Sequence, residues 1–517
     1  MKKIKVLEIN NIDLLGRRFN GYDMIEDFKN DPDIEITQKV ITKMSENKSV
    51  STFFNTYLEE YVYEKFLDFE TNELSVHSVF SFSSPKLLDS QEFKDCDIVH
   101  FHMFHNTKLS IYSLIEISKI KKVILTLHDP WFLTGRCVHF YDCKKYLTKC
   151  IDCKNLSTDF SLKEDNCNSL WKLKNKMFEN SNLVIVAGSK WCYNLAMESP
   201  IIKNKDSIKH ISLGIDTKKF KNYKIQKELK EKYNIDEKNV VIFLRAQKSF
   251  KGTEYAVEAF EMLSTKYNVT IITCSEKGWF DHLSNKYQII DLGSIKDDSI
   301  IEVYNLCDIF LMPSVAENFG LMSVEAMSCE KPVIVFNNTG LPSVTDAPRC
   351  GYLVKNKDSR ELMKALKTLI EDENERTRRG KLGRKLVLEN YSQDLYLEKM
   401  KKLYMETFNK KIVKSSDKNK SINYKGKDAI KIMNKLNEFS CKFFDKKSKE
   451  YKQLQYDVEK VENYNIDYSN ENVCLIIDNY CKDFYQLIKG KDSMVLSAGF
   501  KRKLKNRVKK VIAKIKK

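Results

Sequence analysis

The feature that most constrains this fold is an alternation of short Val- and Ile-rich apolar runs with stretches of helical periodicity, which extends over the first ~400 residues. Strands that are buried on both faces read as nearly continuous apolar runs, and parallel strands are joined by helical crossovers. The candidate strands are 5–10, 97–102, 123–128, 183–188 and 208–213 in the first half, and 240–245, 269–274, 287–292, 309–314 and 332–337 in the second. This pattern predicts two doubly wound α/β domains with parallel sheets.

A polar, Lys-rich stretch follows Leu213–Phe220 and indicates the boundary between the two domains. The predicted organisation is a Rossmann-like domain at 1–213 with a Cys-rich loop at 137–153, a second Rossmann-like domain at 214–390, a helix at 391–408, a helical extension of unknown role at 409–499 and a basic amphipathic tail at 500–517.

The composition indicates a cytoplasmic protein. The N-terminal segment, Met1–Gly16, begins with lysines but lacks a continuous apolar region, so we interpret it as a first strand and not as a signal peptide. No run approaches the length needed to span a membrane. The 14 cysteines are therefore expected to be reduced thiols or metal ligands.

The charge of the chain is concentrated at its end. Net charge is +17, and ten positive charges fall within the last 17 residues, which contain no acid. Subtracting those ten leaves about +7, so the body of the chain gives no reason to expect nucleic-acid binding. In Phe500–Lys517 apolar residues recur at helical spacing, which predicts a helix lying peripherally on an anionic membrane surface. A solvated helix and a nucleic-acid-binding tail are the alternatives.

Two glutamates, Glu317 and Glu325, flank the start of a predicted helix within Ser314–Val344. The preceding apolar strand and the turn Asn318–Gly320 lead into that helix. The unpaired amides and the dipole of a helix start form an anion site that suits a diphosphate. Glu325 lies eight residues after Glu317, about two turns or roughly 12 Å along a helix, so one carboxylate can reach a sugar and the other a ribose.

This string of strand, ENFG turn, helix, strand and GLP turn resembles the E-x7-E motif of retaining, nucleotide-sugar-dependent glycosyltransferases of the family 4 type, which have the GT-B fold. The resemblance covers residues 1–408 and implies that the helix at 391–408 crosses back onto the first domain. It also implies an acceptor-side first domain and a second domain that binds the nucleotide sugar.

The resemblance further implies roles for the residues of the motif. Glu317 would hold hydroxyls of the donor sugar, and Glu325 would hold the ribose. Amides near Phe319, Gly320 and Leu321 would stabilise the leaving diphosphate, with Asn318 beside them.

Two cations, Arg245 and Lys251, follow a strand in LRAQKSFKGTEY and resemble the Arg and Lys that bind the donor diphosphate in the family. Their spacing is one residue longer than usual, and no Gly precedes Arg245. Surface cations are the alternative interpretation. In the loop after the first strand, where family members are rich in glycine, this chain has only Gly16 and Gly21; Gly16 could allow close approach of the backbone to the donor.

Histidines lie within two neighbouring candidate strands. His128 ends a strand in TLHDPW, and the matching His in the family lies near the reacting sugar and the acceptor; a core histidine is the alternative. His100 and His102 share one face of the preceding strand. They could bind a metal, but no acidic or Cys ligand lies nearby in that segment, and we favour a structural, site-lining role.

Four cysteines, Cys137, Cys143, Cys150 and Cys153, have the spacing C-x5-C-x6-C-x2-C. This spacing fits a closed, structural zinc site, and four reduced thiols are the alternative. We expect no cofactor for catalysis, because the two cations and the helix start can offset the charge of a diphosphate without a DxD-type metal site.

The expected activity is transfer of a hexosyl unit, with retention, from a nucleoside diphosphate sugar of the UDP or GDP type to a cell-envelope or lipid-linked glycan. A GT-B sugar-nucleotide epimerase and a catalytically silent GT-B partner subunit are the alternatives. An NAD-dependent oxidoreductase is disfavoured, because no candidate strand is followed by G-x-G-x-x-G.

Overall fold

The computed structural model describes residues 3–13, 23–54, 56–81, 83–107, 109–158, 160–295, 299–412, 422–457 and 466–489. Gly16 and the tail 500–517 lie outside the described residues, so the predictions made for them stay predictions.

The first domain is built on a parallel seven-stranded sheet in the order β3-β2-β1-β4-β5-β6-β7. Its strands are β1 (Ile4–Ile12), β2 (Ile34–Thr42), β3 (Val50–Thr52), β4 (Ile98–Phe101), β5 (Lys122–Leu127), β6 (Leu183–Ala187) and β7 (Ile208–His210). Its helices are α1 (Asp23–Asp27), α2 (Tyr57–Asn72), α3 (Ser83–Asp89), α4 (Gln91–Asp95), α5 (Phe104–Thr107), α6 (Ser113–Ile120), α7 (Cys167–Glu179) and α8 (Lys190–Glu198). The chain order reverses between β1 and β4, which leaves a crevice at the carboxyl ends of these strands.

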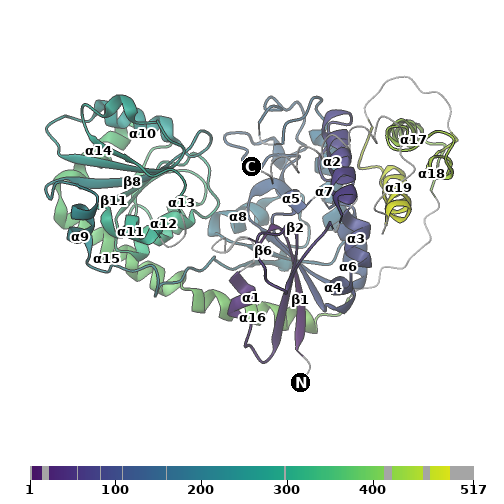
Figure 1. Ribbon diagram of the computed structural model, residues 1–517, viewed down its shortest axis with the longest axis horizontal. Coiled ribbons are helices and arrows are strands. Elements are labelled where there is room, and N and C mark those ends of the chain that lie inside the picture. Colours follow the sequence, from purple (N-terminus) through teal and green to yellow (C-terminus); the bar gives the residue numbers. More distant parts are fainter. Residues whose placement is uncertain are drawn as a thin grey trace, which may run out of the picture.

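The second domain is built on a parallel six-stranded sheet in the order β10-β9-β8-β11-β12-β13 (Figure 1). Its strands are β8 (Val240–Ala246), β9 (Val269–Ser275), β10 (Gln288–Asp291), β11 (Ile309–Met312), β12 (Val333–Phe336) and β13 (Tyr352–Val354). Its helices are α9 (Gln226–Lys232), α10 (Thr253–Met262), α11 (Ser299–Leu306), α12 (Leu321–Ser328), α13 (Leu341–Val344), α14 (Ser359–Glu371) and α15 (Glu373–Asn390). The equivalent reversal lies between β8 and β11. The prediction of two doubly wound parallel-sheet domains is confirmed.

Helix α16 (Gln393–Asn409) joins the two domains. Figure 1 shows it running from the second domain to the underside of the first sheet, where it packs against β1 and β4. Tyr396, Met400 and Tyr404 form its buried face, and Lys401 makes an ion pair with Asp31 at 2.8 Å. The last segment of the second domain thereby becomes part of the core of the first.

The described part of the C-terminal extension also packs on the first domain. Helices α17 (Lys427–Ser440), α18 (Lys449–Gln453) and α19 (Glu471–Ile488) share a single hydrophobic core with it. The ring of Phe439 contacts Phe66 at 4.8 Å and Phe69 at 4.4 Å between centroids. The extension is therefore an added layer of the first domain. None of the described helices has both the length and the apolar content needed to cross a membrane.

Candidate active site

A cavity of about 1360 Å³ lies between the two domains, at the carboxyl ends of strands from both sheets. The residues predicted for the site that line it are His128, Arg245, Lys251, Glu317, Asn318, Phe319, Gly320, Leu321 and Glu325. Parallel sheets bind ligands at the point where the strand order reverses, and the loops after β8 and β11 flank that point. The structure thus brings together all the predicted donor-side residues that it describes.

Lys251 is held in the cavity wall by the connection between β8 and α10. The next residue, Gly252, has φ +68°, and a Cβ atom there would lie 1.9 Å from the carbonyl oxygen of Pro313. Only glycine allows this connection to lie directly against the segment that follows β11. Lys251 Nζ consequently lies 2.7 Å from Glu317 Oε2. Arg245, at the end of β8, lines the same cavity.

The turn into α12 fixes Glu317 and exposes a helix start. The Glu317 amide donates to Thr339 Oγ1 at 2.8 Å, and its carbonyl accepts from the Gly340 amide at 2.8 Å. Gly320 precedes the helix with φ +79°, and no side chain hydrogen-bonds to cap this helix start. The first amides of α12 face a cavity that can receive an anion.

Glu325 projects from α12 into the same cavity and is oriented by Tyr304 of α11. The Tyr304 hydroxyl donates to Glu325 Oε2 at 2.8 Å. Burial, followed by the charge of Glu325, holds the pKa of Tyr304 well above its usual range. The phenol is therefore a neutral, permanent donor, and it fixes one carboxylate oxygen of Glu325.

Asn318 connects the two walls of the cavity. Its amide Nδ2 donates to the carbonyl oxygens of Leu127 at 3.2 Å and His128 at 2.8 Å, which lie at the end of β5 in the first domain. Its Oδ1 accepts from the Ser189 hydroxyl at 2.7 Å. A residue of the turn between Glu317 and α12 therefore contacts the backbone of His128 directly.

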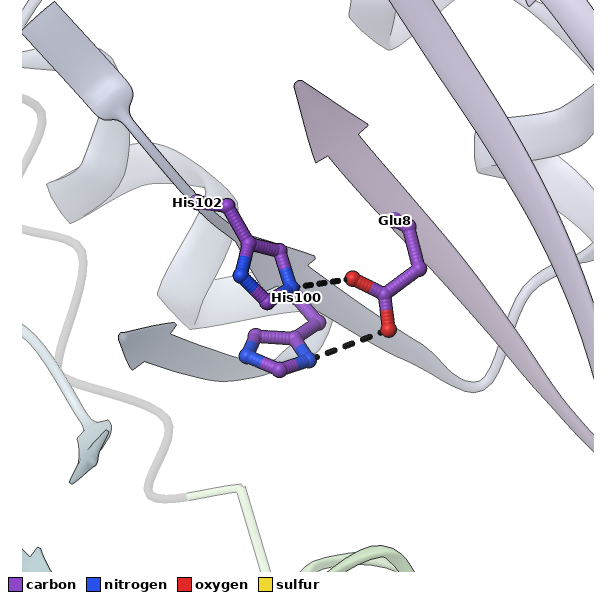
Figure 2. A group of neighbouring side chains, drawn as sticks. All are labelled: Glu8, His100 and His102. Atoms are coloured by element: carbon purple, nitrogen blue, oxygen red, sulfur yellow. Dashed lines mark hydrogen bonds and ion pairs between the residues drawn. The ribbon is translucent and has the colours of Figure 1, made fainter. Parts of the chain in front are cut away.

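His128 ends a chain of buried hydrogen bonds that begins in β1. Its Nε2 lies 2.9 Å from Nδ1 of His102, and His102 Nε2 is hydrogen-bonded to Glu8 Oε2. Glu8 stands opposite His100 in the β1–β4 register, and Figure 2 shows both imidazoles directed at its carboxylate. This polar chain therefore links three neighbouring strands, β1, β4 and β5.

The other oxygen of Glu8 has its own partners. Glu8 Oε1 accepts from the Tyr404 hydroxyl at 2.7 Å and lies 3.1 Å from His100 Nδ1. His100 Nε2 in turn lies 2.7 Å from Thr126 Oγ1. Each nitrogen of His100 has a partner, as buried polar groups require.

The electrostatics of this chain follow from its burial. Burial raises the pKa of Glu8, but the charges of His100 and His102 and their hydrogen bonds outweigh it and hold the pKa well below its usual range. Burial lowers the pKa of His100 to about 4. Burial and the neighbouring imidazoles also hold the pKa of His128 well below its usual range. At neutral pH Glu8 is a carboxylate, and His100 and His128 are neutral.

Glu8, His100 and His102 are close enough to share a metal ion, and they form the one such group among the residues described. The atoms that could bind a metal, however, already form hydrogen bonds between Glu8 and the two histidines. The second ring nitrogen of His100 faces Thr126, and that of His102 faces His128. These bonds account for the arrangement and favour the structural role for His100 and His102. The site-lining part of the prediction is wrong, because both residues are buried and neither lines the cavity.

The Cys-rich loop reaches from the first domain to the second. The His139 ring lies 4.2 Å from the Phe250 ring, next to Lys251, and Asp142 forms a 3.6 Å ion pair with Lys357. Two buried basic side chains hold the loop from within, although burial lowers the pKa of Lys174 to about 7. Lys174 donates to the carbonyls of Trp131, Thr134 and Gly135, and Arg136 donates to those of Asn155, Leu156 and Phe160.

The thiols of this loop are not gathered into a zinc-like arrangement. No three of the sulfur atoms of Cys137, Cys143, Cys150 and Cys153, all of which are described, lie within 4.8 Å of one another. Cys150 Sγ instead accepts from the Gly135 amide at 3.2 Å, and burial raises the pKa of this thiol to about 12. Binding of zinc would require these side chains to move, so the structural zinc stays a prediction.

The two domains and the crossing helix define the GT-B class of fold, and the comparisons with known proteins agree. Residues 225–386 match the family described as glycosyl transferases group 1. A fold match is Anabaena Alr3699/HepE in complex with UDP-glucose, with TM-score 0.55 and 15% identity, covering 78% of this chain and 100% of that one.

Two sequence relatives are named as glycosyltransferases. One is the N,N'-diacetylbacillosaminyl-diphospho-undecaprenol alpha-1,3-N-acetylgalactosaminyltransferase of Campylobacter jejuni, 27% identical over 46% of this chain and 63% of the relative. Another is the capsular polysaccharide biosynthesis glycosyltransferase CapM of Staphylococcus aureus, 26% identical over 34% of this chain and 49% of the relative. The chain thus spans about half to two thirds of these curated relatives, and the matches support a glycosyltransferase enzyme.

Several residues of the hydrogen-bond networks behind the cavity were not predicted from the sequence. They are Glu8, Ser189, Tyr304, Thr339 and Tyr404. A signal existed for Glu8, because a carboxylate within the apolar run KVLEIN must find a partner when the strand is buried. Tyr404 lies 396 residues away from Glu8 and carries no such local signal.

Proposed function

We propose that this protein is a retaining glycosyltransferase that transfers a hexosyl unit from a nucleoside diphosphate sugar to a hydroxyl of a lipid-linked or cell-envelope glycan. The observation that carries the proposal is one cavity with Lys251, Glu317 and the start of α12 on one wall and His128 on the other. The resemblance of Glu317 and Glu325 to the E-x7-E pair supports retention.

The second-domain wall suits a leaving nucleoside diphosphate. Negative charge grows on the diphosphate as the glycosidic bond breaks, and donors fixed in advance stabilise it most effectively. Lys251, Arg245 and the first amides of α12 supply that stabilisation. Glu325, oriented by Tyr304, is placed to accept hydrogen bonds from a ribose.

Glu317 and Lys251 exchange partners in this account. Their ion pair places a carboxylate beside the cation that the diphosphate requires. When the donor binds, Lys251 turns to the phosphate oxygens, and Glu317 accepts hydrogen bonds from sugar hydroxyls. His128 is uncharged at neutral pH and faces the same space, so it offers a neutral hydrogen-bonding nitrogen to the sugar or the acceptor.

A lipid-linked acceptor is supported by two observations. The Campylobacter relative is named for a diphospho-undecaprenol-linked acceptor. The tail of this chain carries ten positive charges and no acid in its last 17 residues, which suits an anionic membrane surface. We propose that the enzyme works at the inner face of a membrane. Removing 500–517 should release the protein from anionic vesicles, and undiminished sedimentation would contradict the tether.

A screen of UDP- and GDP-hexoses tests the activity. Purified protein should release UDP or GDP slowly from one donor through hydrolysis and faster with a lipid-linked acceptor, and the product should keep the anomeric configuration of the donor. Conversion of the nucleotide sugar to an isomer without release of nucleotide would indicate an epimerase. Absence of turnover with every donor and acceptor would favour a silent partner subunit.

A further inference from the structure

We propose that Glu8 and His102 are positioning residues that set the tautomer of His128, so that its Nδ1 acts as a hydrogen-bond acceptor for a sugar hydroxyl in the cavity. The task given to His128 rests on the proposed function. The tautomer follows from the chain of contacts together with one hydrogen on each imidazole.

Glu8 fixes the direction of donation along this chain of hydrogen bonds. A carboxylate only accepts hydrogen bonds, so the nitrogen that faces Glu8 Oε2, His102 Nε2, carries the hydrogen. With one hydrogen on each imidazole, His102 Nδ1 is then an acceptor. His128 Nε2, 2.9 Å away, must donate to it. A neutral imidazole has one donor and one acceptor, which leaves Nδ1 of His128 as the acceptor.

The two oxygens of Glu8 have separate tasks. Oε1 takes the Tyr404 hydroxyl and faces His100 Nδ1, contacts that anchor β1 to α16 and β4. Oε2 faces His102, which leads to the cavity. All members except His128 are buried, with Glu8 and His100 at 0% and His102 at 1% exposure, so water does not compete for these bonds. A buried carboxylate that fixes an imidazole tautomer is a known catalytic device, here extended by one further imidazole.

This division makes Glu8→Gln a sharp test. Two donors, the Tyr404 hydroxyl and His100 Nδ1, contact Oε1 of Glu8. The amide oxygen of the new Gln side chain should therefore take the place of Oε1. The NH2 group then faces His102 Nε2, which must become an acceptor. The hydrogen of His102 moves to Nδ1, and His128 must change to the Nδ1–H tautomer.

The readout is nitrogen NMR of the full-length protein labelled with 15N-histidine, with the His128 signals identified by their loss in His128→Asn. We expect the Nε2–H tautomer for His128 in the wild type and the Nδ1–H tautomer in Glu8→Gln. We also expect kcat to fall by about tenfold or more, because a wrong imidazole tautomer costs much more than that in a Ser-His-Asp triad. The KM for the donor should change by no more than about threefold, since no group that contacts the diphosphate is altered.

The matched control is Thr126→Val, which removes the hydroxyl partner of His100 and leaves the line from Glu8 Oε2 to His128 intact. In Thr126→Val, His128 should keep its wild-type tautomer, and kcat should change by less than about threefold, even if the free energy of unfolding decreases.

Three results would overturn the inference. They are an Nδ1–H or doubly protonated His128 in the wild type, an unchanged tautomer or unchanged kcat in Glu8→Gln, and a stoichiometric metal bound at Glu8, which would replace the His102 hydrogen. The wild-type spectrum decides the matter even if Glu8→Gln does not fold. Failure of the proposed function would show differently, as a chain with the expected tautomers and no turnover of any nucleotide sugar.

Discussion

Lys251 Nζ lies 2.7 Å from Glu317 Oε2, and the two side chains are only 12% and 18% exposed. They come from connections after two adjacent strands, β8 and β11, and meet at the cavity wall. A phosphate that binds Lys251 must compete with this carboxylate. Under the proposed function, the ion pair would couple the binding of a diphosphate at Lys251 to the release of Glu317 toward the sugar.

Replacing Glu317 with Gln should separate binding from turnover. The side chain keeps its shape, but Lys251 loses its competing anion, so affinity for UDP or GDP should stay the same or increase by up to about tenfold. Turnover should fall by about 100-fold or more, because the carboxylate poised at the sugar is lost. Calorimetric titration and donor hydrolysis measure the two effects, and weakened nucleotide binding in a folded variant would contradict the competition.

Asn318→Asp should loosen the contact between the domains. The new carboxylate would face the carbonyl oxygens of Leu127 and His128, which now accept from the Asn318 amide. We expect a larger radius of gyration by small-angle scattering. We also expect an activity loss of about 10- to 100-fold, the size of effect that a shift of roughly 1 Å can have. Ser189→Ala, which removes only the hydroxyl partner of Asn318, should show a smaller change in both measurements. Identical scattering and full activity in Asn318→Asp would argue against the contact.

The unfolding free energy should decrease as the pH falls from about 6.5 to about 4. The pKa of His100 is about 4 in the folded chain, below its ordinary value of 6.5, so the unfolded state binds more protons within this window. His100 alone contributes about 3 kcal/mol to the decrease. Urea unfolding at successive pH values measures it.

In His100→Gln the same pH dependence should be shallower, because one titrating group is lost. The contribution of Glu8 to the free energy of unfolding is lost at lower pH. Its pKa in the folded chain is depressed, so this contribution declines only below the usual titration range of glutamate. A variant as pH-sensitive as the wild type between pH 6.5 and 4 would show that His100 is not neutral in the folded chain.

The cysteine loop should bind about one zinc ion per chain. No three of the four sulfur atoms lie within 4.8 Å of one another, so metal binding must bring them closer together. The double variant Cys150→Ser, Cys153→Ser should lose the zinc, whereas Cys441→Ser, in the C-terminal extension, should retain it. Metal analysis of protein prepared without chelators measures the zinc content. Zinc-free wild-type protein would contradict the prediction and leave plain thiols in a loop whose backbone is held by Lys174 and Arg136.

The sequence predicts the fold well because its signals are local. All ten candidate strands are present with shifted ends, and β2, β3 and β13 are the described strands that were missed. The segment Ile34–Thr42 of β2 mixes Glu, Thr, Gln and Lys with its apolar residues, and β3 and β13 have three residues each, too few to establish a pattern.

The candidate site is predictable in part for a similar reason. His128, Lys251 and Glu317 each follow a parallel strand, and such ends meet at one edge of a sheet. Contacts over long sequence distances are not predictable in this way. Asn318 reaches the carbonyl of His128 across 190 residues, and Tyr404 reaches Glu8 across 396. The same holds for the thiols, since spacing indicates which cysteines could bind a metal but not whether the loop brings them together.

The most direct test of the central claim, that a nucleoside diphosphate binds against Lys251, is calorimetric titration of UDP and GDP into Lys251→Ala. The control is Lys248→Ala, which removes the same charge from the same loop at an exposed position outside the cavity. We predict that Lys251→Ala weakens the preferred nucleotide by about 10- to 100-fold, the worth of a charge-assisted hydrogen bond, whereas Lys248→Ala changes its affinity by less than about twofold. Wild-type affinity in Lys251→Ala, or equal losses in the two variants, would contradict the claim.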